Sequence, residues 1–571
     1  MKEIIITNCE ACAGCNRCIR ACPVEEANIA YFQDGKIKVR VDAEKCIACG
    51  ACISACQHGA RGYRDDLERF FSDLKSGKSI SMLVAPAVRS NFENWPSLLA
   101  WLKSMGVRTV FDVSLGADIC TWAHIRYIEK EKPESLITQP CPAIVNYIAK
   151  YQPEMISRLS PVHSPMSCTA VFMKKVMNIT DRIAALSPCI GKTAEFEETG
   201  LVEYNVTFKR LCEYIERNHI RIPEATFEFD HVESSLGQIY SMPGGLKENI
   251  EHYLGKAVRV DKSEGPSVVY RHLDLMANEQ AENLPPVFDV LNCAEGCNAG
   301  TGCVHSATLF EMNHAMEKAR QKALEAYPQA AMPELFDRFD RRLSISDYLR
   351  SYKKQTTGRI SYAPEDVEAA FESLGKRTQE QKDHNCYACG SETCREMAVR
   401  IAKGINVPQS CIEKTRQDIL HEHQAFIGER ETSAANVARI SEEVGEIQRL
   451  FSDMLADVRS VSGVIGEYEQ MAKLINGMAM QTKILSINAS VEAARAGAAG
   501  KGFSVVAEAI RDLATQSQES VATTQDASVF ANQTIHAITE ASTKVDDSIL
   551  RVVEYVDEIS KSMGKGRTQQ P

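Results

Sequence analysis

Apolar residues in the last part of the chain recur at alternating steps of three and four, first between residues 437 and 468 and again between 538 and 559. This heptad spacing places the apolar side chains on one face of a long helix, which then packs against a partner helix. The segment between the two series contains three glycines typical of a turn, Gly497, Gly500 and Gly502. Residues 430–565 are therefore predicted to form a long antiparallel α-helical coiled-coil hairpin, with arms of about 60 residues and a length of ~90 Å.

A different pattern governs residues 78–335, where short apolar runs alternate with segments of helical spacing. The runs "SISMLVAPAV", "VRTVFDVSL", "RIAALSPC" and "VFDVLNC" are typical of short buried strands, so this region is predicted to be an α/β domain. Cysteines follow three apolar runs directly or closely, and a fourth cysteine comes four residues after the last of them. Because strand ends converge on one crevice in α/β proteins, we expect one dispersed four-thiolate set: Cys141, Cys189, Cys293 and Cys297.

The composition places the protein in a broad class. With 571 residues, the chain is long enough for about three to five domains. Its net charge of −11 argues against a nucleic-acid surface. No apolar run approaches the ~18 residues of a membrane span, and the first residues, "MKEIIITNCE", lack the apolar core of a signal peptide. We therefore expect a multidomain cytoplasmic protein with no transmembrane segment and no nucleic-acid partner.

The 21 cysteines of a chain in a reducing compartment indicate metal or redox sites rather than disulfides. Two runs follow the spacing C-x2-C-x2-C-x3-C: Cys12, Cys15, Cys18 and Cys22, and then Cys46, Cys49, Cys52 and Cys56. With this spacing, three thiolates bind one 4Fe-4S cluster and the fourth reaches the neighbouring cluster. The duplicated run resembles a two-cluster bacterial ferredoxin, which implies an α+β domain over residues 1–62. Zinc ribbons or free thiols are the alternative.

A third block of cysteines has the spacing C-x2-C-x4-C-x16-C and consists of Cys386, Cys389, Cys394 and Cys411. The segment "CREMAVRIAKG" inside it has helical apolar spacing and ends at Gly404, a natural helix stop. Residues 365–425 are therefore predicted to form a small helical domain with a single 4Fe-4S cluster. Zinc is the alternative, because four thiolates satisfy either metal.

The central cysteines lie in the motifs "TQPCPA", "SPCIGK" and "LNCAEGC", and "SLGADIC", "VHSPM" and "YSMPGGL" accompany them. In these motifs the sequence resembles the iron-only (FeFe) hydrogenase family over most of residues 1–335. The resemblance implies that Cys141, Cys189, Cys293 and Cys297 hold the 4Fe-4S cluster of an H-cluster. It also implies that Cys297 bridges to a diiron unit with CO and CN⁻ ligands, inserted by maturation proteins. Lys192 would donate a hydrogen bond to a cyanide nitrogen, and Ser164 and Gly296 would adjoin the cofactor.

The chain departs from that family at the positions that move protons. Catalytic members have a cysteine where this chain has Pro140, and Gln139 replaces the serine before it. The carboxylates expected after "GAD" are replaced by Ala123, His124 and Tyr127, and two methionines by Ser187 and Leu291. General acid–base groups typically contribute ~10²–10⁴ in rate, so turnover is expected to be low. His124 and His163 are expected to be packing or solvated residues rather than a second proton route. The other cysteines are expected to be unligated thiols, with Cys168 as the candidate for redox activity: Cys9, Cys120, Cys168, Cys212 and Cys303.

The predicted turn of the hairpin, "QTKILSINASVEAARAGAAGKGFSVVAEAIRDLA", is similar to the signalling tip of methyl-accepting chemotaxis receptors. The matching positions are Gln481, Asn488, Glu492, Ala493, Ala494, Arg495, Ala496, Gly497, Gly502 and Phe503. The resemblance implies docking on the chemotaxis kinase and its coupling protein, and the long heptad seams predict a homodimer, because their apolar stripe needs a partner. Receptors usually have glutamate at Ala498, which weakens the expectation of docking. A purely structural stalk is the alternative.

These segments together suggest a sensory hydrogenase, in which H₂ binding or the redox state of the clusters is the input and the hairpin is the output. Two alternatives remain open. The first is a slow, working ferredoxin-linked hydrogenase with the hairpin as scaffold. The second is an iron–sulfur redox sensor that lacks the diiron unit, against which the retention of Cys297 and Lys192 argues.

Overall fold

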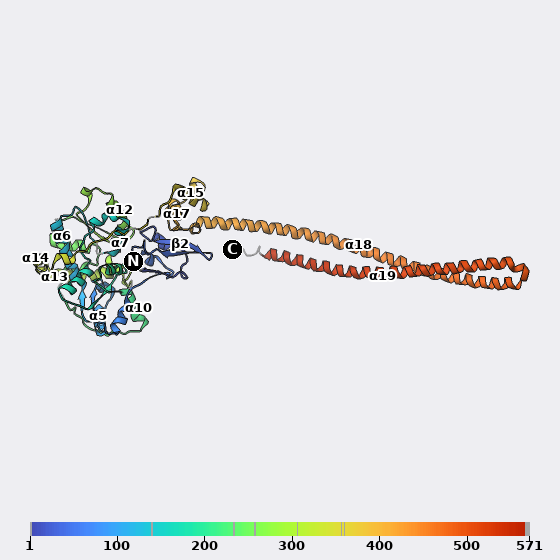
Figure 1. Cartoon of the computed structure of the whole chain (residues 1–571), viewed down its shortest axis with the longest axis horizontal. Coiled ribbons are helices and arrows are strands. Elements are labelled where there is room, and N and C mark those ends of the chain that lie inside the picture. The colour runs from blue at the N-terminus through green and yellow to red at the C-terminus, as the bar shows by residue number, and fades with distance from the viewer. Residues whose placement is uncertain are drawn as a thin grey trace. The chain divides into compact units, whose positions relative to one another are not determined.

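The computed structural model of the chain describes residues 3–138, 141–231, 234–255, 258–304, 307–355, 357–358 and 360–565. It divides into two compact units, Met1–Arg416 and Gln417–Pro571. Figure 1 shows the first unit as a mixture of strands and helices and the second as two long helices. None of the helices in the described part of the chain has the length and hydrophobicity of a membrane span.

The N-terminal segment of the first unit is a small α+β arrangement around two cysteine loops. Its strands form two antiparallel pairs, β1 (Ile5–Thr7) with β4 (Arg61–Tyr63) and β2 (Asn28–Gln33) with β3 (Lys36–Val41). The short helices α1 (Arg17–Arg20) and α2 (Ala51–Ala55) begin inside the cysteine runs. This is the ferredoxin-like organisation that the duplicated motif predicted.

The α/β region contains two parallel sheets. The first has the order β6-β5-β8-β9, made of β5 (Ile80–Val84), β6 (Val110–Asp112), β8 (Arg182–Ser187) and β9 (Tyr204–Thr207). The second has the order β10-β11-β7, made of β7 (Leu136–Ile137), β10 (Val260–Glu264) and β11 (Val287–Leu291). The four apolar runs singled out in the sequence correspond to β5, β6, β8 and β11. The prediction of an α/β domain is therefore confirmed.

Helices cover these sheets and bring several chain segments to one place. The helices from Leu67 to Leu254 are α3 (Leu67–Lys75), α4 (Val88–Asn91), α5 (Trp95–Ser104), α6 (Val113–Glu131), α7 (Pro142–Tyr151), α8 (Pro165–Lys175), α9 (Lys192–Thr199), α10 (Phe208–Arg217) and α11 (Gly245–Leu254). They are followed by α12 (Val269–Ala277), α13 (Leu309–Ala326) and α14 (Met332–Arg342). Helix α6 is buried continuously from Val113 to Ile125, because it lies within the core rather than on its surface.

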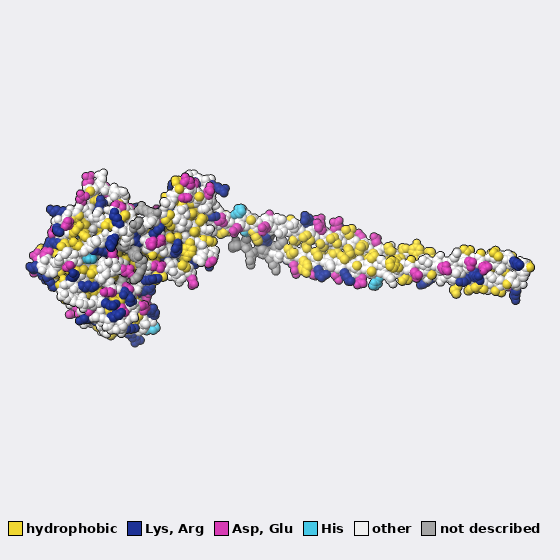
Figure 2. Space-filling model, viewed as in Figure 1, with side chains coloured by type: hydrophobic (Ala, Val, Ile, Leu, Met, Phe, Trp, Pro, Cys, Tyr) yellow, Lys and Arg dark blue, Asp and Glu magenta, His cyan; other side chains and the backbone are white. Residues whose placement is uncertain are grey.

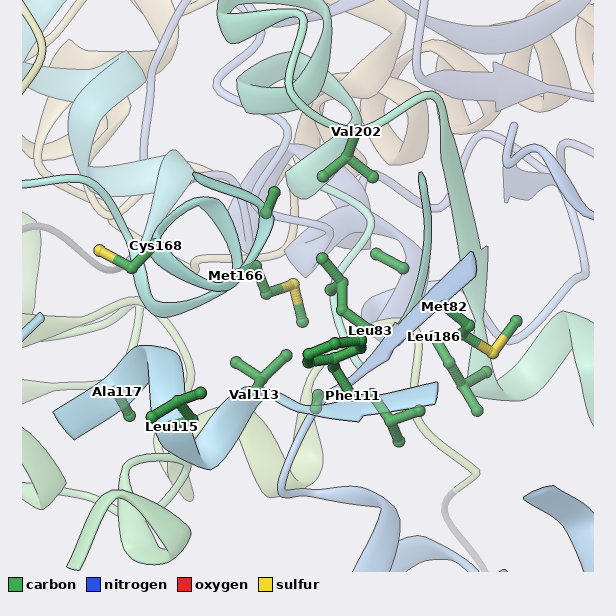
Figure 3. Close-up of a cluster of buried hydrophobic side chains, with 14 of the residues drawn as sticks. Met82, Leu83, Phe111, Val113, Leu115, Ala117, Met166, Cys168, Leu186 and Val202 are labelled. Carbon is green, nitrogen blue, oxygen red and sulfur yellow. The ribbon is translucent and has the colours of Figure 1, made fainter. Parts of the chain in front are cut away.

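Two hydrophobic cores lie at the centre of the α/β region and at its border with the ferredoxin-like segment. The larger core gathers side chains from the four-stranded sheet and from α6 and α8. Figure 3 shows Met82 and Leu83 of β5, Phe111 of β6, Leu186 of β8 and Met166 of α8 in this core. The second core joins Val24 and Ile47 of the ferredoxin-like segment to Ile137, Ile144 and Phe288 of the α/β region. The ferredoxin-like segment therefore packs directly against the three-stranded sheet.

A small helical segment follows, with α15 (Pro364–Ser373), α16 (Gln379–Lys382) and α17 (Cys394–Ala402). Its core combines Phe371, Leu374 and Met397 with three thiols, Cys389, Cys394 and Cys411.

The second unit is an antiparallel pair of helices, consisting of most of α18 (Ile412–Arg495) and all of α19 (Lys501–Lys565). The turn between them is a 3-10 segment, Gly497–Gly500, which contains two of the three glycines predicted for it, whereas Gly502 lies in α19. Gly497 has φ +65°, and a Cβ on Gly500 would lie 2.1 Å from the Ala493 carbonyl oxygen. Small residues are buried between the arms near this turn: Ala472, Ala479, Ser486 and Ala493 on α18, and Ala507 and Ala514 on α19. Many large apolar side chains of the hairpin remain exposed, and Figure 2 shows them along its arms.

Candidate metal centre

The four central cysteines line one cavity in the first unit. Cys141 is the residue before α7, and Cys189 lies between β8 and α9. Cys293 follows β11, and Cys297 lies in the 3-10 segment Gly296–Ala299. All four cysteines line this cavity, in which the space not filled by protein atoms, including the part open to solvent, is about 850 Å³. The end of β8, in the four-stranded sheet, and the end of β11, in the three-stranded sheet, therefore meet at one site.

Close backbone contacts position the loop that presents Cys297. The Cys297 N–H donates to the Ser241 carbonyl oxygen at 2.8 Å. Gly296 has φ +62°, and a Cβ there would lie 2.3 Å from that same oxygen. A Cβ on Gly300 would lie 2.5 Å from the Pro188 carbonyl oxygen. Glycine is required at both positions, because a side chain would displace the loop.

The electrostatics of this thiol set fit a group that carries positive charge. Burial raises the pKa of Cys189 to about 11 and that of Cys297 to about 12, and the neighbouring thiols add to both shifts. Burial also raises the pKa of Cys293 well above its usual value, again with the other thiols contributing. The thiolate forms are therefore stable together only when bound to metal.

The spacing of the thiols also bears on the kind of metal group. Within the part of the chain that the structure describes, no three Cys, His, Asp or Glu side chains form a site for a single metal ion. A cubane attaches each of its four ligands to a different iron atom, so four separated thiols on one cavity are compatible with it.

Lys192 lines the cavity and belongs to a buried polar group. Its Nζ donates to Ser164 Oγ at 2.8 Å and to Glu195 Oε2 at 2.6 Å. Glu195 also accepts from Ser167 Oγ at 2.6 Å. Burial alone would raise the pKa of Glu195, but the positive charges of Lys192 and Arg350 lower it to about 2. The sequence analysis missed Glu195, although its spacing of three from Lys192 on a helix could have indicated the pair.

A second buried polar group lies on α6 and α8. The Cys120 and Cys168 sulfur atoms both lie within hydrogen-bonding distance of the His163 carbonyl oxygen, at 3.3 and 3.2 Å. Tyr240, which lines the cavity, donates its hydroxyl to Cys120 Sγ at 3.4 Å, and His124 Nδ1 lies 2.8 Å from the Cys120 carbonyl oxygen. Burial would raise the pKa of Cys120, but hydrogen bonding by Cys168 and the charge of His124 hold it well below its usual value. Cys168 thus has a thiol partner that the sequence did not reveal.

Asp118 of the "SLGADIC" motif positions the segment that carries Tyr240 and Ser241. Its carboxylate accepts from the Ser235 N–H at 2.6 Å, the Ser235 hydroxyl at 2.7 Å and the Gly237 N–H at 2.9 Å. The motif therefore supports the cavity wall from α6. Pro140 stands where a proton-donating cysteine was expected, and Gln139 precedes it. Both residues lie outside the described residues.

The ferredoxin-like cysteines are arranged around two loops, one of which borders the central cavity. Ala48 and Cys49 line that cavity, and Asn292 Nδ2 donates to the Cys49 carbonyl oxygen at 3.3 Å. Burial raises the pKa of Cys22 to about 11, and Cys46 of the second run adds to the shift. Burial and then the charge of Cys22 raise the pKa of Cys49. Cys22, the last cysteine of the first run, thus lies close to cysteines of the second run.

The third cysteine block lines a cavity of its own. It contains about 310 Å³ of unfilled space, and its walls include all four cysteines of the block: Cys386, Cys389, Cys394 and Cys411. Cys386 is exposed and the other three are buried. Burial raises the pKa of Cys389, and the Cys411 and Cys386 thiols contribute to the rise. In this set, as in the central one, the four candidate metal ligands are therefore all cysteine sulfur atoms.

Three family models match parts of this chain. Residues 4–57 match the 4Fe-4S dicluster domain, and residues 78–301 match the C-terminal domain of the iron-only hydrogenase large subunit. Residues 432–568 match the methyl-accepting chemotaxis protein signalling domain. The three resemblances stated from the motifs are confirmed at this level.

Similar proteins also fall into these groups. The sensory transducer protein YvaQ of Bacillus subtilis is 34% identical over 125 residues, 22% of each chain. The methyl-accepting chemotaxis protein McpB of Bacillus subtilis is 36% identical over 112 residues, 19% of this chain and 16% of its own. The chain thus spans only about a fifth of the length of these curated relatives.

Among solved structures, the FeFe-hydrogenase HydA1 from Chlamydomonas reinhardtii matches with a TM-score of 0.39 and 15% identity, covering 52% of this chain and 100% of its own. The family models, rather than this likeness, support the assignment. One chain therefore joins a 4Fe-4S dicluster domain, the C-terminal domain of an iron-only hydrogenase large subunit and a methyl-accepting chemotaxis protein signalling domain.

Proposed function

We propose that this protein is a sensor in which H₂, or the redox state of its iron–sulfur clusters, controls the chemotaxis-type hairpin. The observation that carries the proposal is the cavity lined by Cys141, Cys189, Cys293, Cys297 and Lys192 in a chain that also contains a signalling domain. The residues that would hold an H-cluster lie together there. The cysteine that would deliver protons is replaced in the sequence by Pro140.

The cofactors follow from the donor sets. Cys141, Cys189, Cys293 and Cys297 would hold a 4Fe-4S cluster, and Cys297 would bridge it to a diiron unit inserted by maturation proteins. The two ferredoxin-type clusters and a cluster on Cys386, Cys389, Cys394 and Cys411 would bring the total to four. When bound, the diiron unit with its CO and CN⁻ ligands supplies the metal chemistry of reversible H₂ binding and cleavage.

The residues of the chain have separate tasks at this site. Lys192 presents a positive charge to the cavity wall, and Ser164 and Glu195 fix the position of its ammonium group. Gly296 allows the Cys297 loop to approach Ser241. Apolar side chains, including Val113, Met166 and Leu291, line the rest of the wall. Such a lining excludes water, so a charge-assisted hydrogen bond from Lys192 is stronger there than in solvent.

The hairpin would provide the output. Its exposed apolar side chains, such as Leu474, Leu485 and Phe530, are suited to a second copy of the chain, so we propose a homodimer. The partners in signalling would be a chemotaxis kinase and its coupling protein.

A second candidate, a slow ferredoxin-linked hydrogenase, is favoured by one observation. Tyr240, Cys120 and His124 form a buried group of titratable side chains beside the cavity. Titratable side chains such as these can carry protons, which the side chain of Pro140 cannot do.

Infrared spectroscopy tests the proposal. Protein matured with the diiron unit is examined under H₂ and under argon, and H₂ oxidation is measured on the same sample. A sensor is expected to show CO and CN⁻ bands that shift under H₂ while turnover stays low. Absence of these bands after maturation favours the redox sensor without a diiron unit. Turnover equal to that of catalytic hydrogenases overturns the sensor proposal in favour of the enzyme.

A further inference from the structure

Cys411 has a position that differs from that of every other cysteine. It is the last cysteine of the chain and the residue directly before the 84-residue helix α18. Its carbonyl oxygen accepts from the Thr415 N–H at 3.0 Å and from Thr415 Oγ1 at 3.1 Å. These bonds belong to the first turn of α18, whereas the Cys411 side chain lines the 310 Å³ cavity of the third cysteine block. One residue therefore belongs both to the thiol site and to the start of the hairpin helix.

A second thiol of this block also lies at a helix start. Cys394 is the first residue of α17, and its N–H donates to Asn385 Oδ1 at 2.7 Å, while the Asn385 N–H donates to Cys394 Sγ at 3.3 Å. Helix N-termini carry partial positive charge and stabilise a negative charge nearby. Four thiolates around a cubane give a net negative charge, which grows by one unit when the cubane takes up an electron. The N-termini of α17 and α18 thus favour the reduced form of a cubane bound at these thiols.

The third block also contacts the ferredoxin-like segment. Lys403 Nζ lies 2.6 Å from Glu25 Oε2 and 3.4 Å from Glu26 Oε1. The Ala30 N–H donates to the Ile405 carbonyl oxygen at 3.0 Å. A Cβ on Gly390 would lie 3.1 Å from the carbonyl oxygen of Asn16, which stands between Cys15 and Cys18. The third block therefore lies directly beside the first ferredoxin loop.

We propose that the four-thiol site of Cys386, Cys389, Cys394 and Cys411 is the junction at which a change of charge alters the first turns of α18. The added electron strengthens the attraction between the site and the helix N-terminus, so fraying of the first turn decreases. The proposal rests on the proposed function only in taking the hairpin as the output. It needs neither H₂ nor a diiron unit, because dithionite can supply the electron while its radical anion is oxidised to sulfite.

The test is hydrogen–deuterium exchange of the full-length, anaerobically reconstituted protein, read by mass spectrometry over residues 405–430. Electron paramagnetic resonance counts the reduced clusters in the same samples. After dithionite, exchange at residues 412–420 is expected to slow by about two- to fivefold, the range that one charge at a helix N-terminus provides. Unchanged exchange in samples whose clusters are all reduced overturns the proposal, as does zinc instead of iron at this site.

Three variants locate the effect. Cys411→Ala is expected to lose one cluster and the exchange response, whereas Cys212→Ala, which removes a thiol outside all four cysteine sets, is expected to keep both. A third variant carries two glycines inserted between Cys411 and Ile412, which leaves every thiol in place but separates the site from α18. It is expected to retain the cluster signal and lose the response. A response that persists in Cys411→Ala or in the insertion variant contradicts the junction.

Discussion

Lys192 Nζ lies 2.6 Å from Glu195 Oε2, and both side chains are buried, one helical turn apart on α9. The pair lies at the wall of the central cavity, where Ser164 Oγ accepts from the same ammonium. A buried ion pair contributes little in total, but removal of one partner leaves an uncompensated charge. The position of Lys192 therefore depends on a carboxylate that does not itself line the cavity.

The first prediction follows from this pair. Glu195→Gln is expected to destabilise the protein by ~3–5 kcal/mol near neutral pH, because the buried Lys192 charge loses its partner. The measurement is urea unfolding of both proteins. The double variant Lys192→Met, Glu195→Leu is the control, and it is expected to recover much of the loss because both charges are gone. Equal stability of wild type and Glu195→Gln would contradict the pairing.

The same pair predicts a pH dependence. The folded-state pKa of Glu195, about 2, lies below its ordinary value of 4.5. The stabilisation is therefore fully present above pH 4.5 and is lost as the pH falls from 4.5 to about 2. The stability difference between wild type and Glu195→Gln should shrink over that range. Metal-free samples are required, because acid releases iron from clusters, and a difference that grows on acidification would refute the assignment.

The second prediction concerns Gly296. Gly296→Ala is expected to lower stability by at least about 1 kcal/mol, because alanine is strained at positive φ. Its Cβ would also meet the Ser241 carbonyl oxygen at 2.3 Å, so the Cys297 loop must move and iron at the central site should be lost. Iron analysis and thermal unfolding measure both effects. Gly62→Ala is the matched control, since a Cβ there meets nothing within 4 Å. Unchanged iron content in Gly296→Ala would be inconsistent with the observed loop.

The third prediction is the cluster content. Four cubanes require about sixteen iron atoms per chain before diiron insertion, since each cubane holds four. Cys386→Ala is expected to remove about four of them, one cubane. Iron and zinc are quantified after anaerobic reconstitution. Zinc bound at the site of Cys386, Cys389, Cys394 and Cys411 would show that this block is not an iron–sulfur site.

The fourth prediction concerns the hairpin. Its exposed apolar side chains need a partner, so the full-length protein is expected to be at least dimeric. Truncation after Gly428 should give a monomer while the cluster spectra remain unchanged. Light scattering coupled to size exclusion measures the mass. A monomeric full-length protein would exclude both the dimer and a receptor-like output.

The fifth prediction concerns Pro140, which lies outside the described residues. Pro140→Cys adds a titratable thiol where catalytic relatives have their proton donor, and Pro140→Ala changes the backbone without adding one. H₂ oxidation by Pro140→Cys should exceed that of Pro140→Ala, by less than the ~10²–10⁴ of a full general acid, because the carboxylates beyond it are absent. Equal rates in the two variants would mean that proton transfer at another position limits the rate of H₂ oxidation.

The sequence alone determined the three domain types and predicted which cysteines belong to each thiol set. Local rules suffice for this: the heptad spacing indicated α18 and α19, apolar runs indicated β5, β6, β8 and β11, and the cysteine spacings indicated which residues belong to one loop. The central cysteines could be associated because they follow apolar runs, and strand ends of α/β proteins converge on one crevice, although β8 and β11 belong to different sheets. The turn glycine Gly497 was also predictable, since a positive φ favours glycine.

The tertiary structure decided what depends on contacts between segments distant in the chain. Cys120 and Cys168 lie 48 positions apart in the sequence and meet only because α6 packs against α8. Lys403 and Glu25 form an ion pair although they lie 378 positions apart in the sequence. In the sequence, Glu195 is only a charged residue on a helix. The structure shows that Glu195 and Lys192 are both buried away from water, and this burial makes their ion pair important. No periodicity encodes such pairs, because packing, rather than local propensity, brings the groups together and sets their electrostatic environment.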